Sequence, residues 1–278
     1  MADKRISGFT SNPNLNEIEG LAGYDAAGNA RISGPEIIEA VKSSIVSDGL
    51  LCLYDAGDYD VATNTWPDSS GNNFGDATLQ NPGVGTTPTK VTVGTGAPYL
   101  ECDDTHMLVD KSANPWTQFS YTQEAWINFT GNSSFSGITD FHPGEEYALY
   151  WGGAGAYFPA DSIIMTVDGF DPYPTSGGAN LPWGGGPTGW YQIVATFTGT
   201  TLTIYLNGEP SVTSTGDLNV GIGPGLNEEL DLLCAHEATT PAIYGFGGNC
   251  GLIGIYTRAL NAAEVKQNFE ANRARFGL

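Results

Sequence analysis

The 278-residue sequence predicts an all-β protein, an antiparallel two-sheet sandwich with a short N-terminal arm and a C-terminal helix. Three observations lead to this prediction. Segments rich in β-branched and aromatic residues alternate with clusters of Gly, Pro, Asn and Asp. No helical pattern separates these segments, and parallel strands would need crossover helices between them. The 38 glycines follow no Gly-X-Y period, so they belong to turns.

The first 47 residues differ from the rest and predict an attachment arm. The tetrapeptide Arg-Ile-Ser-Gly occurs twice, and the second copy runs into a capping-box pattern followed by apolar residues at helical spacing. A helix of about ten residues cannot bury its own apolar face, so this arm should dock on another surface. The residues expected to make the attachment are Arg5, Ile6, Arg31, Ile32, Ile37, Ile38 and Val41. The chain therefore divides into an arm, residues 1–47, and a body, residues 48–278.

The body contains nine predicted strands. They are Leu50–Tyr54, Tyr99–Cys102, Phe119–Thr130, Tyr147–Trp151, Ser162–Val167, Trp190–Phe197, Leu202–Leu206, Leu230–Cys234 and Leu252–Tyr256. The strongest local signal joins Trp190–Phe197 to Leu202–Leu206 through Thr-Gly-Thr-Thr. Asn207-Gly208 then follows, the dipeptide that best tolerates the positive φ angles of a tight hairpin. These segments predict antiparallel strands packed as two sheets.

A helix is predicted after the last strand. Asn261 and Glu264 have the spacing of a capping box. Val265, Phe269 and Phe276 then recur on one face, which predicts an amphipathic helix that closes one end of the sandwich.

The charge lies almost entirely in the body. The formal net charge is −21, and the only basic residues between positions 43 and 257 are Lys90 and Lys111. Such a surface repels phosphate backbones and anionic lipids, so nucleic acid is not an expected partner. No run of about 18 apolar residues is present, so we expect no membrane insertion. The sequence also starts without the apolar region of a secretory leader.

The four cysteines are expected to be buried free thiols. Cys52, Cys102, Cys234 and Cys250 lie in separate segments and show no C-x-x-C spacing. The spacing therefore offers no ready zinc site. A free Cys behaves as a small hydrophobic residue in a protein core.

Two segments resemble one known family. The run from Gly189 to Gly208, GWYQIVATFTGTTLTIYLNG, resembles the hairpin of laminin-G-like, concanavalin-A-like jelly rolls. The run IGIYTRALNAAEV, from Ile253 to Val265, is similar to that family's last strand and its exit. Trp66–Asn73 is similar to the Asp-x-Ser-Gly-Asn turn near the start of the domain. Together these runs bracket residues 49–278 and imply a jelly roll. That fold serves lectins, glycan hydrolases and structural modules, so it leaves the function open.

The arm resembles a different group of proteins. The opening Met-Ala-Asp-Lys-Arg-Ile-Ser-Gly and a later Gly-Leu-Ala-Gly-Tyr-Asp-x-x-Gly-Asn-x-Arg-Ile-Ser stretch are similar to the amino ends of tailed-phage virion proteins. Such arms hold appendages onto a capsid or tail. The resemblance implies phage capsid or tail proteins as partners and a homo-oligomeric assembly.

The sequence predicts no catalytic site and no enzymatic activity. Glycoside hydrolysis needs paired carboxylates, and a Glu-x-Asp-x-Glu strand would place three acids on one face. Glu229 and Asp231 fit this pattern, but Leu233 stands where the third acid should be. The two acids are therefore interpreted as strand-edge or turn residues. Cys234 and His236 share one face of a strand but have no Asn or Asp to orient them.

Calcium is the metal that the sequence favours. Hard cations are bound by oxygen atoms of carboxylates, Asn side chains and carbonyl groups, and Gly-rich turns can supply these. The alternative is that Asp, Asn and Gly only form turns. The candidate ligands are Asp55, Asp58, Asp60, Asp68, Asn72 and Asp76.

Tryptophans in Gly- and Pro-rich loops are the candidates for glycan binding, because their flat faces stack on sugar rings. The candidates are Trp66, Trp116, Trp151 and Trp183, whereas Trp126 and Trp190 are expected in the core. The alternative is that these tryptophans only fix loops to the scaffold.

The main functional hypothesis is a non-enzymatic phage virion protein, a capsid decoration or appendage protein. It would be made in the host cytoplasm and displayed on the outer surface of the particle. The alternative is a lectin-like, carbohydrate-binding module of a tail fibre or secreted protein that recognises host surface glycans. A degenerate hydrolase is a third hypothesis.

Overall fold

The computed structural model describes most of the body. The described residues are 45–79, 86–92, 96–109, 120–129, 135–142, 148–152, 162–165, 181–182, 189–215, 229–236 and 243–278. The attachment residues predicted between Arg5 and Val41 lie outside this part. The attachment hypothesis and the boundary at residue 47 therefore stay predictions.

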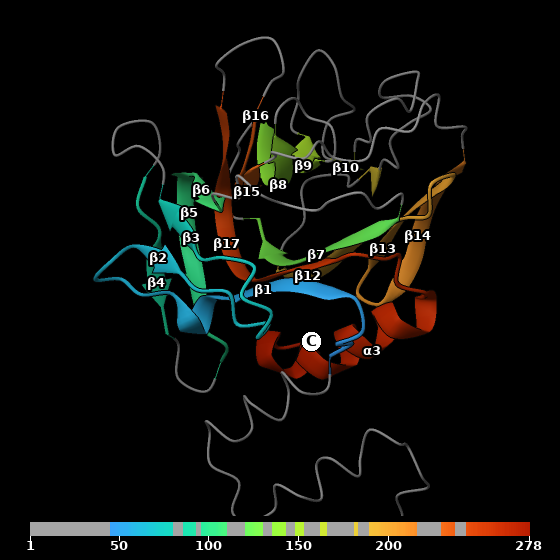
Figure 1. Cartoon of the computed structure of the whole chain (residues 1–278), viewed down its shortest axis with the longest axis horizontal. Helices are drawn as coiled ribbons and strands as arrows, with labels where there is room; N and C mark the ends of the chain where they lie inside the picture. Colours follow the sequence, from blue (N-terminus) through green and yellow to red (C-terminus); the bar gives the residue numbers. More distant parts are fainter. Residues whose placement is uncertain are drawn as a thin grey trace, which may run out of the picture. The chain divides into compact units, whose positions relative to one another are not determined.

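Two antiparallel sheets form the body (Figure 1). In the described part, the first sheet runs in the order β14 (Glu209–Thr215), β13 (Thr201–Leu206), β12 (Trp190–Phe197), β7 (Tyr121–Asn128), β17 (Ile243–Tyr256), β5 (Tyr99–Thr105) and β4 (Thr89–Val91), with β1 (Leu50–Asp55) and β16 (Cys234–His236) also paired to β17. The second runs in the order β11 (Leu181–Pro182), β10 (Ser162–Met165), β9 (Leu149–Gly152), β8 (Phe135–His142), β15 (Glu229–Leu232), β6 (Met107–Val109), β3 (Ala77–Leu79) and β2 (Thr65–Trp66). The predicted all-β jelly-roll sandwich is confirmed.

Strand β17 is the hub of the first sheet. It pairs with β7 along one side, and along the other with β5 and then with β1. The pair Leu50 and Tyr256 therefore joins residues more than 200 positions apart. Two register shifts, after Phe246 and after Cys250, bend this 14-residue strand.

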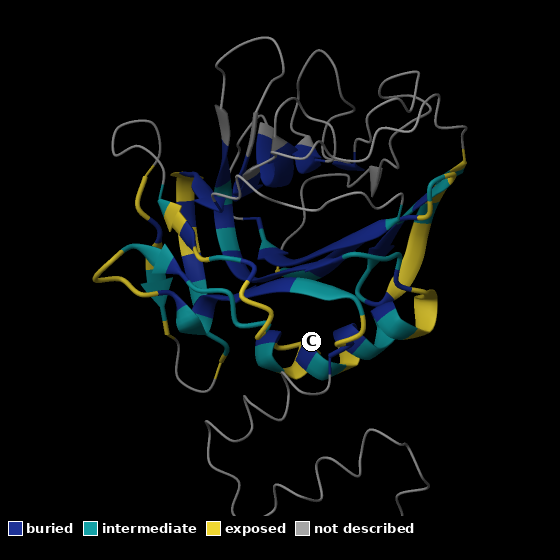
Figure 2. Cartoon of the chain, viewed as in Figure 1, coloured by how far each residue is buried: buried dark blue, intermediate teal, exposed yellow. Residues whose placement is uncertain are grey.

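The core lies between the sheets and follows the alternation of the strands. On β7, Tyr121, Ala125 and Ile127 belong to this core, whereas Glu124 and Trp126 point to the opposite face. Both faces of β7 are buried (Figure 2), because the C-terminal helix covers the outer one. The polar side chains of this strand are therefore buried as well, up to Glu124.

The helix α3 (Ala262–Asn272) confirms the predicted capping box. The Asn261 side chain accepts hydrogen bonds from the N–H groups of Ala263 and Glu264, and the Glu264 side chain accepts one from the Asn261 N–H. A short 3-10 turn, η2 (Arg273–Phe276), follows. It places the Phe276 ring over Gly251, where any Cβ would lie 2.2 Å from a ring carbon.

The strand predictions find most of the long strands, whereas the strands that they miss are mainly short but include β8 and β14, of 8 and 7 residues. The predicted hairpin is confirmed, with Asn207 and Gly208 at positive φ between β13 and β14. Strands β2, β3, β4, β6, β8, β11 and β14 were not predicted. The predicted strand Leu230–Cys234 is wrong in one respect, because it breaks at Leu233, whose φ is +61°.

The cysteine prediction is confirmed, since all four are buried and free. Among the described residues, none of the helices has the length and apolar character needed to cross a membrane.

Candidate functional site

Trp66, predicted to stack on sugars, is a core residue. Its side chain has no exposed surface, its indole N–H donates to the Asp55 carbonyl at 2.7 Å, and its ring packs against Tyr54. The surrounding Gly- and Pro-rich sequence turns the chain so that the ring points inward. The prediction for Trp66 is therefore wrong.

Trp151 is also unsuited to stacking. It is 3% exposed and packs on Phe129 with ring centroids 4.5 Å apart, inside the core between the sheets. Its glycine neighbours suggested a loop, but the residue lies within strand β9 and pairs with Ile163 of β10. Trp116 and Trp183 lie outside the described residues. Trp126 is buried, as expected, whereas Trp190 is half-buried.

The turn at residues 68–76 uses its acids to fix the chain. Asp68 accepts hydrogen bonds from the backbone N–H groups of Leu53, Ser70 and Phe74, at 2.8 to 3.0 Å. Asp76 accepts one from the Asp68 N–H. The Asn72 side chain donates to the Leu50 carbonyl, so its amide nitrogen faces the protein. These contacts fit the turn-forming alternative.

The other proposed calcium ligands are similarly engaged. Asp55 caps η1 (Ala56–Asp58) by accepting from the Gly57 N–H and pairs with Arg275 at 2.7 Å. Asp60 accepts from the Ala62 N–H and the Thr63 hydroxyl. All five aspartates of the proposed set are described, and no three of them bring carboxylate oxygens within 4.8 Å of one another. The structure therefore does not gather them into the predicted calcium site.

Asp231 lies in an internal strand and not at an edge. Strand β15 is flanked by β8 and β6, and Asp231 is fully buried directly opposite Asp140 of β8. The interpretation of Asp231 as an edge or turn acid is wrong, because the sequence did not show that β6 and β8 would cover both sides. The Glu229 side chain lies outside the described part.

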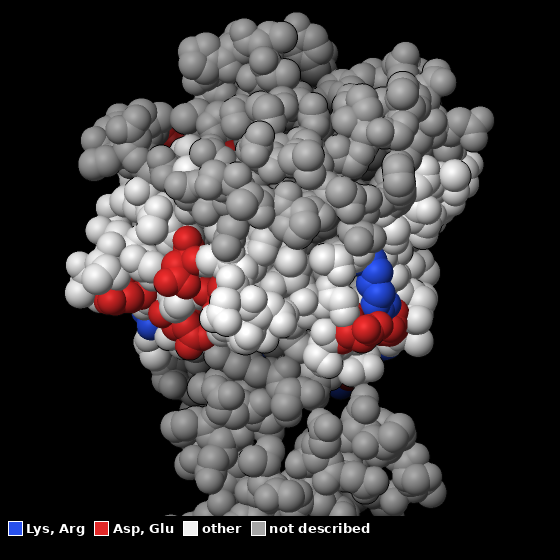
Figure 3. Space-filling view, viewed as in Figure 1, with Lys and Arg blue, Asp and Glu red and all other residues white. Residues whose placement is uncertain are grey.

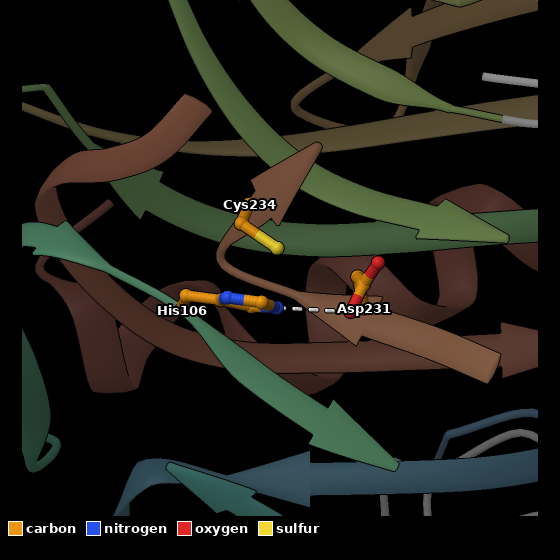
Figure 4. A group of neighbouring side chains, drawn as sticks. All are labelled: His106, Asp231 and Cys234. Carbon is orange, nitrogen blue, oxygen red and sulfur yellow. Dashed lines mark hydrogen bonds and ion pairs between the residues drawn. The ribbon is translucent and has the colours of Figure 1, made fainter. Parts of the chain in front are cut away.

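The buried neighbours of Asp231 are His106 and Cys234 (Figure 4). His106 Nε2 lies 3.1 Å from Asp231 Oδ1, and one ligand atom from each of the three residues lies within 4.8 Å of the others. Burial raises the pKa of the Cys234 thiol well above its usual value, and the charges of Asp231 and Asp140 add to this effect. Sequence spacing paired Cys234 with His236, so it missed the His106 contact, which spans more than 120 positions.

A polar hollow opens on the first sheet. It has a volume of about 450 Å³ and is lined by Thr86, Thr87, Thr89, Glu101, Cys102, Asp103, Gly247 and Gly248. Thr86 is held against β5 because its backbone N–H donates to the Asp104 carbonyl and its hydroxyl to the Asp103 carbonyl. The threonines and both acids of the lining are exposed, so their oxygen atoms are available to a ligand.

Glycine forms the floor of the polar hollow. Gly248 has a φ of +146°, and a Cβ there would lie 2.9 Å from the Asn128 carbonyl oxygen. A side chain at this position is therefore excluded by both conformation and space.

A row of polar side chains extends from the polar hollow across the sheet. Thr89 pairs with Glu101, Glu101 with Asn249, and Asn249 with Asn128. Directly paired residues of antiparallel strands share a face, so these four side chains form one polar row. Trp190 of β12 pairs with Asn128 and continues the row.

Aromatic rings border the polar row. The half-buried rings of Tyr99 and Trp190 meet edge to face, with centroids 5.7 Å apart. Trp190 also packs on Phe276, so η2 fixes its orientation. Figure 3 shows Asp and Glu gathered on the side where β3, β4 and β5 lie. The site thus combines carboxylates, hydroxyls, amides and an aromatic border, and sequence reasoning missed it because its members come from five separate segments.

These features define a jelly-roll sandwich with an open polar surface on one sheet. The model of the concanavalin A-like lectin/glucanases superfamily, Laminin_G_3, matches residues 103–266, which is more than half of the chain. The chain belongs to this superfamily. The laminin-G-like resemblance of the sequence is thereby confirmed, whereas the resemblance of the arm to phage proteins stays a prediction. No curated protein matched the chain.

Solved structures share the fold at low sequence identity. The binding domain of botulinum neurotoxin DC in complex with rat synaptotagmin II is 14% identical, with a TM-score of 0.55 over 81% of this chain and 52% of that chain. The same toxin domain in complex with SialylT is 13% identical, with a TM-score of 0.53 over the same shares. Domain 4 of an extracellular arabinanase from Geobacillus stearothermophilus, in complex with arabinotriose, is 16% identical, with a TM-score of 0.50 over 79% of this chain and 97% of that domain. The chain spans about half the length of the toxin structures.

Proposed function

We propose that the body is a glycan-binding module and that the polar hollow, with the polar row and the Tyr99–Trp190 border, is its binding site. The observation that carries the proposal is the meeting of exposed carboxylates and hydroxyls with an aromatic edge on one open face. Sugar hydroxyls both donate and accept, and sugar C–H faces pack on aromatic rings. Complexes of structural neighbours with arabinotriose and SialylT support this proposal over a phage-specific role.

The charge of the site favours a neutral glycan. Glu101 and Asp103 both line the polar hollow, and the body carries most of the acidic residues of the chain. Sialylated, sulfated or phosphorylated sugars would be repelled by these carboxylates. Neutral oligosaccharides offer hydroxyl groups that can donate to them.

Binding, rather than hydrolysis, fits the surroundings of these acids. A glycosidase needs a proton donor whose pKa is raised by an apolar environment. Glu101 and Asp103 instead face water. The superfamily name covers both lectins and glucanases, so we base the choice of binding over hydrolysis on the exposure of Glu101 and Asp103.

The test is a screen of neutral and anionic oligosaccharides with the full chain, followed by calorimetry on the best ligand. Glu101→Gln and Asp103→Asn together should weaken binding at least tenfold and leave the melting temperature unchanged. Glu270→Gln, which alters an exposed acid of α3, is the matched control and should bind normally. Equal binding by the double variant and the control, or a preference for anionic sugars, would overturn the proposal.

We also propose that the arm attaches this module to a phage particle. The repeated Arg-Ile-Ser-Gly and the near-neutral charge of the arm beside an acidic body support this role. Deletion of residues 1–45 should abolish incorporation into particles while glycan binding persists. Normal incorporation of the shortened chain would contradict it.

A further inference from the structure

The chain passes from one sheet to the other twice at one place, at His106 and at Leu233, and we call this place the sheet corner. Strand β5 belongs to the first sheet and β6 to the second, and His106 is the single residue between them. Strand β15 belongs to the second sheet and β16 pairs with β17 of the first, with Leu233 between them. The left-handed conformation of Leu233 allows the turn, and its backbone N–H donates to Ile138 of β8.

The sheet corner brings three different metal-binding atom types together. His106 offers an imidazole nitrogen, Asp231 a carboxylate oxygen and Cys234 a sulfur, and all three residues are buried. The described part of the chain contains no other group of three such residues within 4.8 Å. The convergence depends on both strand crossings, because neither His106 nor Cys234 lies within the second sheet that holds Asp231.

The set of donor atoms selects the kind of metal. Calcium and magnesium are bound by oxygen atoms alone, whereas nitrogen and sulfur ligands beside one carboxylate are typical of zinc. Zinc bonds of about 2.0–2.3 Å in a tetrahedron place ligand atoms about 3.3–3.7 Å apart. The 3.1 Å separation of His106 Nε2 and Asp231 Oδ1 is close to that range.

We propose that His106, Asp231 and Cys234 form a buried zinc site that joins the two sheets at the sheet corner. All three side chains are buried, which fits a structural zinc ion better than a catalytic one that must meet a substrate. The site therefore stabilises the sandwich and takes no part in glycan binding, because the polar hollow is built from other residues.

Cobalt substitution tests the proposal. The full chain is freed of metal with a chelator and titrated with Co²⁺ alone. A tetrahedral site with one thiolate should give visible d–d bands and a near-ultraviolet thiolate-to-cobalt band, both removed by one equivalent of Zn²⁺. Cys234→Ser should abolish the thiolate band, and His106→Gln should weaken Co²⁺ binding at least tenfold. Cys250→Ser, which changes another buried free thiol, is the matched control and should keep the full spectrum.

A second measurement covers variants that fold poorly. Zn²⁺ added to the metal-free wild-type chain should raise its melting temperature and protect one thiol from alkylation, identified by peptide mapping as Cys234. A wild-type chain without a thiolate band, without zinc-dependent stabilisation, or with Cys234 no better protected than Cys250 would overturn the proposal. A buried His–Asp pair without metal would then be the remaining interpretation.

Discussion

The outer face of the first sheet has two halves, and the same strands run through both. Along β7, Trp126 lies under the C-terminal helix, and Asn128, two residues further, belongs to the polar row. In the covered half, buried polar groups bind one another, as Glu124 accepts hydrogen bonds from Gln192 and Asn268. In the open half, comparable residues face water. The comparison teaches that coverage by α3 and η2, and not residue type, decides which side chains stabilise the fold and which are available to a ligand.

The largest effect is expected where the cover rests on the sheet. The Phe276 ring lies over Gly251 and packs on Trp126 and Trp190 at centroid distances of 4.6 and 4.7 Å. Phe276→Ala should lower the free energy of unfolding by about 3–5 kcal/mol, because the cavity removes the packing partner of both indole rings. Urea unfolding measures this. Val61→Ala, at a side chain 62% exposed, is the control and should change little. A loss below about 1 kcal/mol for Phe276→Ala would mean that the cover is not held by this ring.

The polar contacts under the cover should give the next effect. Asn268 donates to Glu124 at 2.6 Å and to the Tyr256 hydroxyl at 2.9 Å, and burial raises the pKa of Glu124. Asn268→Leu should cost about 2–3 kcal/mol, because it leaves a buried carboxyl with one donor fewer. Adding Glu124→Leu should recover part of the loss. A double-mutant cycle measures the coupling, and strictly additive losses would contradict a shared network.

A smaller, pH-dependent effect is expected at the start of α3. Arg258 holds Glu264 with two hydrogen bonds of 2.7 and 2.9 Å, and this contact, with the Asn261 N–H, lowers the pKa of Glu264. A depressed carboxyl pKa stabilises the fold above the unfolded value and loses that contribution as pH falls through the folded value. Glu264→Gln should cost about 1 kcal/mol at pH 7 and nothing in acid. Unfolding at several pH values measures the difference, and a penalty that persists at low pH would contradict this assignment.

The smallest effect on stability is expected in the open half. Glu101→Gln removes an exposed charge and should change the free energy of unfolding by less than about 0.5 kcal/mol. Thermal unfolding of this variant, compared with Asn268→Leu of the covered half, measures the contrast. A loss of stability as large as that of Asn268→Leu would show that side chains of the open half also stabilise the fold.

Local signals in the sequence predicted what local contacts determine. Asn207-Gly208 fixed a hairpin because few residues tolerate its φ angles, and Asn261 with Glu264 fixed the start of α3. Most of the long strands were recognised by their side chains, although β8 and β14 were not. Short strands such as β4 were missed because three residues are too few to show the alternation of apolar and polar side chains that marks a strand.

The candidate sites could not be predicted, because long-range pairing creates them. Glu101, Asn249 and Asn128 meet only through the register of β5, β17 and β7. The contact of His106 with Asp231 needs two strand crossings. The prediction for Trp66 was wrong because its Gly- and Pro-rich surroundings indicated an exposed loop, whereas its ring is buried in the core. Burial of one residue depends on where the rest of the chain goes.

The place of β17 in the chain has a consequence for synthesis. Its partners β1, β5 and β7 leave the ribosome first, and residue 256 follows residue 50 after roughly 10–40 s of translation at ordinary rates. During that time these three strands wait with unpaired edges, which are open to pairing with other chains. The first sheet is therefore completed only after residue 256 has been synthesised. The many carboxylates of the body, which repel one another between nascent chains, suit a protein whose central strand is made after the strands that it joins.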